Sequence, residues 1–148
     1  MPPSARPDPA ETAARLRLSA TRLARRLRQE TDGDFTPSQL SALATIHNRG
    51  PLTLGALAEI ERVAPPSITK VIAKLEADGL VERMQCPDDG RVSHVSSTDS
   101  GTALIEESRR RKTTWLTARI NTLDPQAQSS LAAALDALDA LIAGEEPT

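Results

Sequence analysis

The stretch Pro65–Gly79, PPSITKVIAKLEADG, restricts the fold of this chain more than any other segment. Two prolines suit the first turn of a helix, where backbone N–H groups need no partner within the helix. Gly79 can take the left-handed conformation that ends a helix. Apolar residues recur between them at spacings of three and four, which predicts one apolar helix face. These residues are Ile68, Val71, Ile72 and Leu75.

The opposite face of this predicted helix is short, polar and cationic. Hydroxyl and ammonium groups can hydrogen-bond base edges and neutralise phosphates, so the face has the chemistry of a helix that enters a DNA major groove. An ordinary solvated helix surface can have the same composition. The candidate contact residues are Pro65, Pro66, Ser67, Thr69, Lys70 and Lys74.

A β-hairpin is predicted directly after this helix. Leu80–Met84 alternates in character, Pro87–Gly90 has the composition of a turn, and Arg91–Val95 can return as the partner strand. Another short helix is predicted before the Pro65–Gly79 helix, over residues 54–63 with Thr53 as N-cap. Two short helices joined by a tight turn and followed by a hairpin are typical of a winged helix-turn-helix. The turn between the helices contains no glycine, which is a departure from the usual pattern.

Further helices are predicted on both sides of this centre. Thr36 and Gln39 form the pattern of a capping box, so a helix begins at Pro37. Residues 1–9 contain four prolines and are expected to form a loose arm. We therefore predict a mainly α fold with a small β-hairpin in a single chain, 1–148. Residues 36–97 form the winged helix-turn-helix, and 10–34 with 99–143 form dimerisation helices.

The first and last helices each carry a narrow apolar stripe with alternating spacings of three and four. Such a stripe on a charged helix packs against another helix. The arginines around the first stripe, and the basic run Arg109–Lys112, are interpreted as solvated faces. The candidate dimerisation residues are Leu16, Leu23, Leu27, Leu131, Leu135 and Leu138.

Composition limits the possible functions. The net charge is −2, so any contact with DNA depends on a local patch rather than on overall basicity. Phe35 and Trp115 are the aromatic residues, which argues against a stacking platform for single strands. No glycine loop for phosphate, nucleophile elbow or metal-spaced His/Cys/Glu set is present. We therefore expect no catalytic residue, metal or cofactor, and His47 is interpreted as a helix-end residue.

The lone cysteine, Cys86, fits a reducing compartment. No apolar run is long enough for a membrane span and no signal peptide is evident, so a cytoplasmic protein is expected. Two interpretations of Cys86 remain open: an inert strand-end residue, or a thiol whose oxidation loosens the hairpin. Reactivity requires an electropositive, accessible setting, and the neighbouring Asp88 and Asp89 oppose it.

From about Ala10 to Ala143 the predicted elements resemble the MarR family of bacterial winged-helix transcriptional regulators. The specific marks are the segment Leu52–Arg83, the Asp-x-Arg of the wing at 89–91, and the helix opening at 98–101. The resemblance implies a homodimer that presents two recognition helices to a pseudopalindromic DNA operator. It also implies that Arg91 reaches the minor groove or its phosphates and that Asp89 holds Arg91.

The resemblance further implies a repressor of a nearby efflux, resistance or metabolic gene, released by a small phenolic or aromatic acid whose binding residues are unknown. Two alternatives remain: a winged-helix protein–protein adaptor without specific DNA binding, and a redox sensor acting through Cys86. Two departures from the family stand out. Ser93 and Ser97 occupy positions usually apolar in the returning wing strand, and the N-terminal cysteine and tyrosines of the peroxide-sensing branch are absent.

Overall fold

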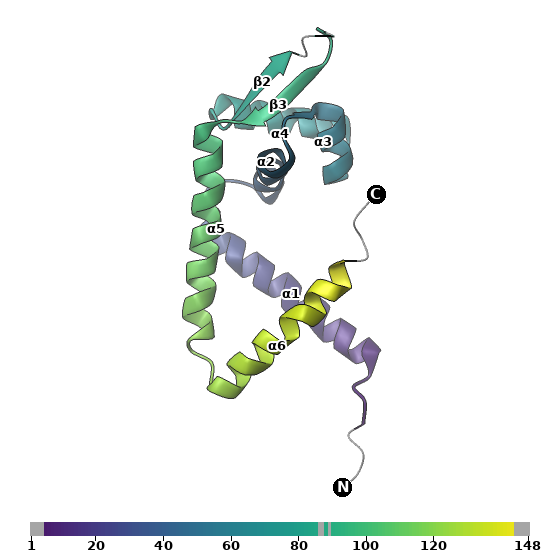
Figure 1. Ribbon diagram of the computed structural model, residues 1–148, viewed down its shortest axis with the longest axis vertical. Helices are drawn as coiled ribbons and strands as arrows, with labels where there is room; N and C mark the ends of the chain where they lie inside the picture. Colours follow the sequence, from purple (N-terminus) through teal and green to yellow (C-terminus); the bar gives the residue numbers. More distant parts are fainter. Residues whose placement is uncertain (1–4, 86–87, 89, 144–148) are drawn as a thin grey trace. The chain divides into compact units, whose positions relative to one another are not determined.

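The computed structural model describes residues 5–143 apart from 86, 87 and 89. Packing divides the chain into two units, Met1–Lys112 and Thr113–Thr148, with the boundary inside α5. Figure 1 colours the chain along its sequence and labels the helices and the strands β2 and β3. In chain order, the elements are α1 (Pro9–Thr31), α2 (Pro37–Arg49), β1 (Leu52–Thr53), α3 (Leu54–Glu61), α4 (Pro65–Ala77), β2 (Val81–Gln85), β3 (Ser93–Ser97), α5 (Asp99–Ile120) and α6 (Pro125–Ile142).

The described strands form a three-stranded antiparallel sheet in the order β1-β3-β2. The sequence predicted the β2–β3 hairpin but missed β1. In β1, Leu52 pairs with Val95 and Thr53 pairs with His94. A two-residue strand has no alternation of its own, and only its long-range partner reveals it. The strands also begin one or two residues later than predicted, with Arg91 still in the turn.

The hydrophobic core of the described chain is built from α2, α3, α4, the sheet and the first turns of α5. The predicted apolar face of α4 is confirmed, because Ile68, Ile72 and Leu75 are buried and Val71 packs against them partly buried. Val95 anchors the centre of the sheet with no exposed surface. The mainly α architecture with a winged helix-turn-helix is therefore confirmed.

The predicted helix starts are confirmed by hydrogen bonds. The Gln39 N–H donates to Thr36 Oγ1 at 3.2 Å, and the Thr36 N–H donates to Gln39 Oε1 at 3.1 Å. Thr53 caps α3 by accepting from the Ala56 N–H at 3.0 Å. Each cap satisfies N–H groups that the helix itself leaves without an acceptor, which fixes where α2 and α3 begin.

The end of α4 and the start of α5 are joined. Gly79 has φ +73°, and the Leu80 N–H donates to the Leu75 carbonyl at 2.9 Å, closing α4 as predicted. The Thr98 hydroxyl donates to the Gly79 carbonyl at 2.6 Å and accepts from the Gly101 N–H at 3.1 Å. A side chain at Gly101 would place its Cβ against the Leu80 carbonyl oxygen, so glycine is required for this approach.

The terminal helices bury little of their apolar surface. None of the described residues of α6 is buried, and in α1 only Thr31 is. Leu23, Leu131 and Leu135 are between 40% and 52% exposed, whereas Leu16, Leu27 and Leu138 are partly buried. Their assignment to a dimer seam, and the domain boundaries drawn from it, stay predictions. No helix in the described ranges combines the length and apolar character needed to cross a membrane.

Candidate nucleic-acid interface

The polar face of α4 is solvent-exposed along its length. Every candidate contact residue on it is exposed: Pro65, Pro66, Ser67, Thr69, Lys70 and Lys74. The Ser67 N–H already donates to the Ala64 carbonyl at 2.9 Å, and the two prolines have no N–H. The start of α4 therefore offers few backbone donors to a phosphate, and contacts with DNA must come from its side chains.

The hydroxyl and ammonium groups on this face differ in how they are engaged. The Thr69 hydroxyl donates to the Pro65 carbonyl at 3.0 Å, so toward a ligand it presents its lone pairs and its methyl group. No hydrogen bond or ion pair to a described residue holds Lys70. Lys74 pairs with Asp78 at 3.1 Å, one turn further on. An exposed pair of this kind contributes little, roughly 0–1 kcal/mol, so Lys74 can exchange Asp78 for a phosphate.

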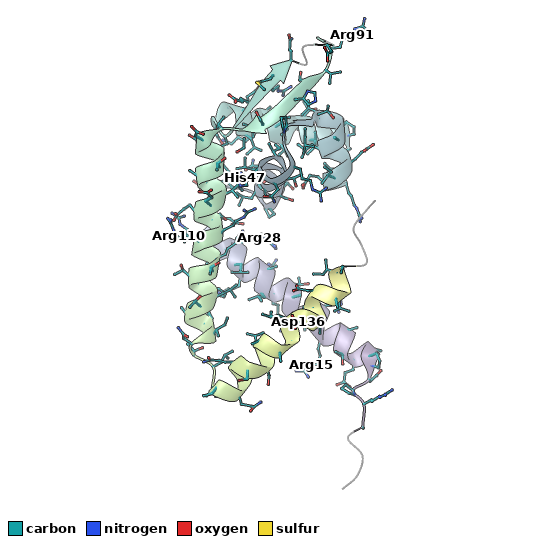
Figure 2. The ribbon with its side chains drawn as sticks, in the orientation of Figure 1. Arg15, Arg28, His47, Arg91, Arg110 and Asp136 are labelled. Carbon is teal, nitrogen blue, oxygen red and sulfur yellow. The ribbon has the colours of Figure 1, made fainter. Side chains whose placement is uncertain are left out.

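The wing is the hairpin of β2 and β3, and Arg91 lies at its tip, as Figure 2 shows. Arg91 is exposed there. The predicted partner Asp89, and the candidate redox residue Cys86, lie outside the described residues. Despite the polar residues Ser93 and Ser97, which are partly buried, β3 is anchored at its middle by the fully buried Val95.

An exposed ion pair links the wing to α4. Arg83 in β2 donates through Nε to Glu76 Oε2 in α4 at 3.1 Å. Together with the buried Val81 at the start of β2, this contact holds the base of the hairpin beside the end of α4. Sequence analysis missed it, because the two residues lie seven apart in different elements and no local spacing pairs them.

The turn between α3 and α4 contains no glycine, and Arg62 takes the left-handed conformation there, with φ 54° and ψ 44°. Its N–H donates to the Glu59 carbonyl at 3.2 Å. Beside it, Glu61 accepts hydrogen bonds from Ser41 and Thr45 of α2. Sequence reasoning overlooked Glu61, whose partners are sixteen and twenty residues away.

A separate hollow of about 440 Å³ lies between α1, α2 and α5 within the first unit. Arg28, Arg109 and Lys112 line it, against the single carboxylate of Asp32. Asp32 pairs with Lys112 at 3.2 Å, and Arg109 donates to the Asn48 side chain at 3.1 Å. Arg109, Arg110 and Arg111 are exposed, as the interpretation of a solvated face has it, although Arg109 also bonds α2. Lys112 differs, because it is partly buried and pairs with the buried Asp32.

Comparison with known proteins shows that the chain is similar to transcriptional regulators. Residues 35–93 match the MarR family. An HTH-type transcriptional regulator of Mycobacterium tuberculosis is 43% identical over 134 residues, which cover 90% of this chain and 94% of that protein. The HTH-type transcriptional repressor MdtR of Bacillus subtilis is 36% identical over 72 residues, or 49% of this chain and 46% of that protein.

Solved structures extend the likeness to the whole fold. A putative transcriptional regulator of Pseudomonas aeruginosa superposes with a TM-score of 0.82 at 31% identity, covering 93% of this chain and 96% of that one. The residues that match the family, 35–93, include all of α4 and β2. A relative 43% identical over 90% of this chain and a solved structure with the same fold, together with the family match, show that the chain belongs to the MarR family of winged helix-turn-helix transcriptional regulators.

Proposed function

We propose that this regulator is a homodimeric repressor that binds a pseudopalindromic operator. In each subunit α4 enters the major groove and the wing reaches the adjacent minor groove. The observation that carries the proposal is the exposed polar face of α4 next to a hairpin with Arg91 at its tip. A helix and a wing at one end of the winged helix-turn-helix suit the reading of two neighbouring grooves.

The residues of this interface divide between bases and phosphates. Ser67, Thr69 and Lys70 lie early on α4, where recognition helices most often meet base edges. Lys74 lies one turn later and is better placed for a phosphate. Arg91 is suited to the negative potential of a narrow A·T-rich minor groove, which it would read as shape without base hydrogen bonds. Asp89 would direct its guanidinium.

The dimer proposal is supported by the exposed leucines of the terminal helices. Leu23, Leu131 and Leu135 expose 40% or more of their surface, and they lie on the two apolar stripes whose spacing predicts a helical partner. A second copy that covers the stripes of α1 and α6 would bury these side chains. Two symmetric subunits then match an operator with two half-sites.

Repression and release by a ligand are the finer parts of the proposal. The likeness to the repressor MdtR supports repression, here of a nearby efflux, resistance or metabolic gene. The hollow between α1, α2 and α5 contains three cationic side chains and one carboxylate, so it suits a small organic anion such as an aromatic acid. The protein would act on chromosomal DNA in the cytoplasm.

The proposal is tested by selecting genomic fragments that the protein binds and then titrating the best fragment at several salt concentrations. Specific duplex binding should weaken linearly on logarithmic axes through counterion release. Arg91→Ala should lower operator affinity by roughly 1–3 kcal/mol and reduce the preference for A·T-rich flanks. Salicylate added to the complex should release the DNA. A protein–protein adaptor would show no selected fragment and no salt-dependent duplex binding.

A further inference from the structure

A carboxylate bridge joins α3 to α2 where the chain turns toward the recognition helix. Ser41 Oγ donates to Glu61 Oε2 at 2.7 Å, and Thr45 Oγ1 donates to Glu61 Oε1 at 2.5 Å. Because Ser41 and Thr45 are four residues apart, their hydroxyls lie on one face of α2. Each meets its own oxygen of the carboxylate, so the two bonds fix both the position and the rotation of that group.

Glu61 is the last residue of α3, and three residues separate it from α4. Arg62 turns the chain through the left-handed conformation, and the Val63 N–H closes the turn by donating to the Ala58 carbonyl at 3.1 Å. With so short a connection, the direction in which the chain leaves Glu61 sets the direction in which α4 begins at Pro65. The bridge therefore acts at the base of the recognition helix.

The core holds α3 one turn earlier than the bridge does. Leu57 and Ala58 are buried, whereas Glu59 and Ile60 are exposed. Among the three residues that follow Ala58 in α3, Glu61 is the partly buried one, and its carboxylate supplies the side-chain hydrogen bonds to α2. Hydrogen bonds to an ionised acceptor are about twice as strong as neutral ones, so this bridge is well suited to fixing that turn.

We propose that Glu61 is a positioning residue for sequence readout. Through Ser41 and Thr45 it holds the turn that presents the start of α4 to base edges. The proposal rests on the proposed DNA-binding function and extends it to a residue that does not touch DNA. A negative charge close to the interface reduces affinity for every duplex alike, whereas a positioning role affects the operator more than random DNA.

The experiment compares Glu61→Ala with Glu59→Ala, which removes the same charge from an exposed site on the same helix. Both variants should raise affinity for random duplex by a similar small factor, about twofold. Only Glu61→Ala should lower the ratio of operator to random affinity, by about tenfold, comparable to one mismatched base pair. Glu61→Gln can accept one hydrogen bond and donate the other to a hydroxyl, so it should restore most of the ratio.

A second measurement uses the protein without DNA. Amide exchange at Arg62 and Val63 should be several-fold faster in Glu61→Ala than in Glu59→Ala, because the turn loses its anchor. Equal exchange rates, or equal operator-to-random ratios in the two folded variants, would overturn the positioning role while leaving operator binding intact. A wild-type protein with no sequence preference would instead overturn the proposed function, and the readout role of Glu61 with it.

Discussion

The winged-helix region and the terminal helices use the same kind of apolar spacing in opposite ways. Described hydrophobic residues that are buried all lie between Leu40 and Ile105, and none of the described residues of α6 is buried. The stripe of α4 lies against α2, α3 and the sheet, whereas Leu23 and Leu135 are about half exposed. The winged-helix region thus has a core of its own, whereas the terminal helices leave much of their apolar surface exposed.

This difference shows what spacing alone can tell. A three-four pattern predicts an apolar helix face in both regions, and both helices are present. The pattern does not say whether the same chain or another one covers that face. In α4 the answer comes from Val95 and other residues that are distant in sequence, so only the folded chain supplies it.

The largest effect is expected from placing charged residues in the proposed dimer seam. Leu23→Glu together with Leu135→Glu should convert the dimer to monomers, because each buried leucine contributes about 1.5–3 kcal/mol and the pair occurs twice per dimer. Light scattering measures the mass, and circular dichroism checks that the winged-helix region is still folded. Leu18→Glu with Leu141→Glu is the matched control, at exposed leucines outside the stripes. A folded double variant that stays dimeric would show that the seam lies elsewhere.

A cavity in the winged-helix core should have the next largest effect. Ile72 is fully buried, so Ile72→Ala should lower the free energy of unfolding by about 2–5 kcal/mol. Ile60→Ala, at a side chain 37% exposed on α3, should cost about 1 kcal/mol or less. Urea denaturation of both proteins measures the difference. Equal losses would mean that the winged-helix region does not depend on its own core.

Within α4, substitution of the two lysines tests whether base contacts and phosphate contacts come from different residues. Lys70→Ala should cost roughly 1–3 kcal/mol on the operator and relax its sequence preference. Lys74→Ala should weaken all duplexes about equally and reduce the salt slope by about one, with a smaller net cost because Lys74 must first leave Asp78. Titrations on operator and random duplex measure both. Identical patterns for the two variants would contradict this division.

The smallest effect is expected at Arg62. Arg62→Gly removes the strain of a left-handed residue but adds chain entropy to the unfolded state, and each amounts to roughly 1 kcal/mol. The free energy of unfolding should therefore change by less than about 0.5 kcal/mol, whereas the β-branched Arg62→Val should destabilise by about 1–2 kcal/mol. Thermal melts compare the two. A large loss in the glycine variant would assign the arginine side chain a role in the fold.

Local chemistry was predictable and long-range pairing was not. The caps at Thr36 and Thr53 and the stop at Gly79 follow from residues within one helical turn, and they were found from sequence. The ion pair of Lys74 and Asp78 is also local, because residues four apart lie on one helix face. The bridge at Glu61 had no such signal.

The same limit applied to the sheet and the basic run. Strand β1 is defined by its pairing with β3, more than forty residues later in the printed sequence. Lys112 pairs with Asp32, and these two residues lie about twice as far apart along the chain. The exposed polar face of α4 was predicted from sequence, because the spacing along one helix is enough to define its faces. That its residues contact DNA stays a prediction. The turn before α4 was not predictable in the same way, because its contacts through Glu61 are made with α2.

The hydroxyl of Thr98 connects two helices that have different tasks. It donates to the carbonyl of Gly79, two residues after α4 ends, and accepts from the N–H of Gly101 at the start of α5. The Thr98 N–H also donates to the Leu80 carbonyl, and Gly101 lies so close to that carbonyl that no side chain would fit. The start of α5 and the end of α4 are therefore closely packed. A displacement of the first turn of α5 must either carry the end of α4 with it or break these bonds. A shift of the first turn of α5 is therefore transmitted to the end of α4 through the hydrogen bonds of Thr98.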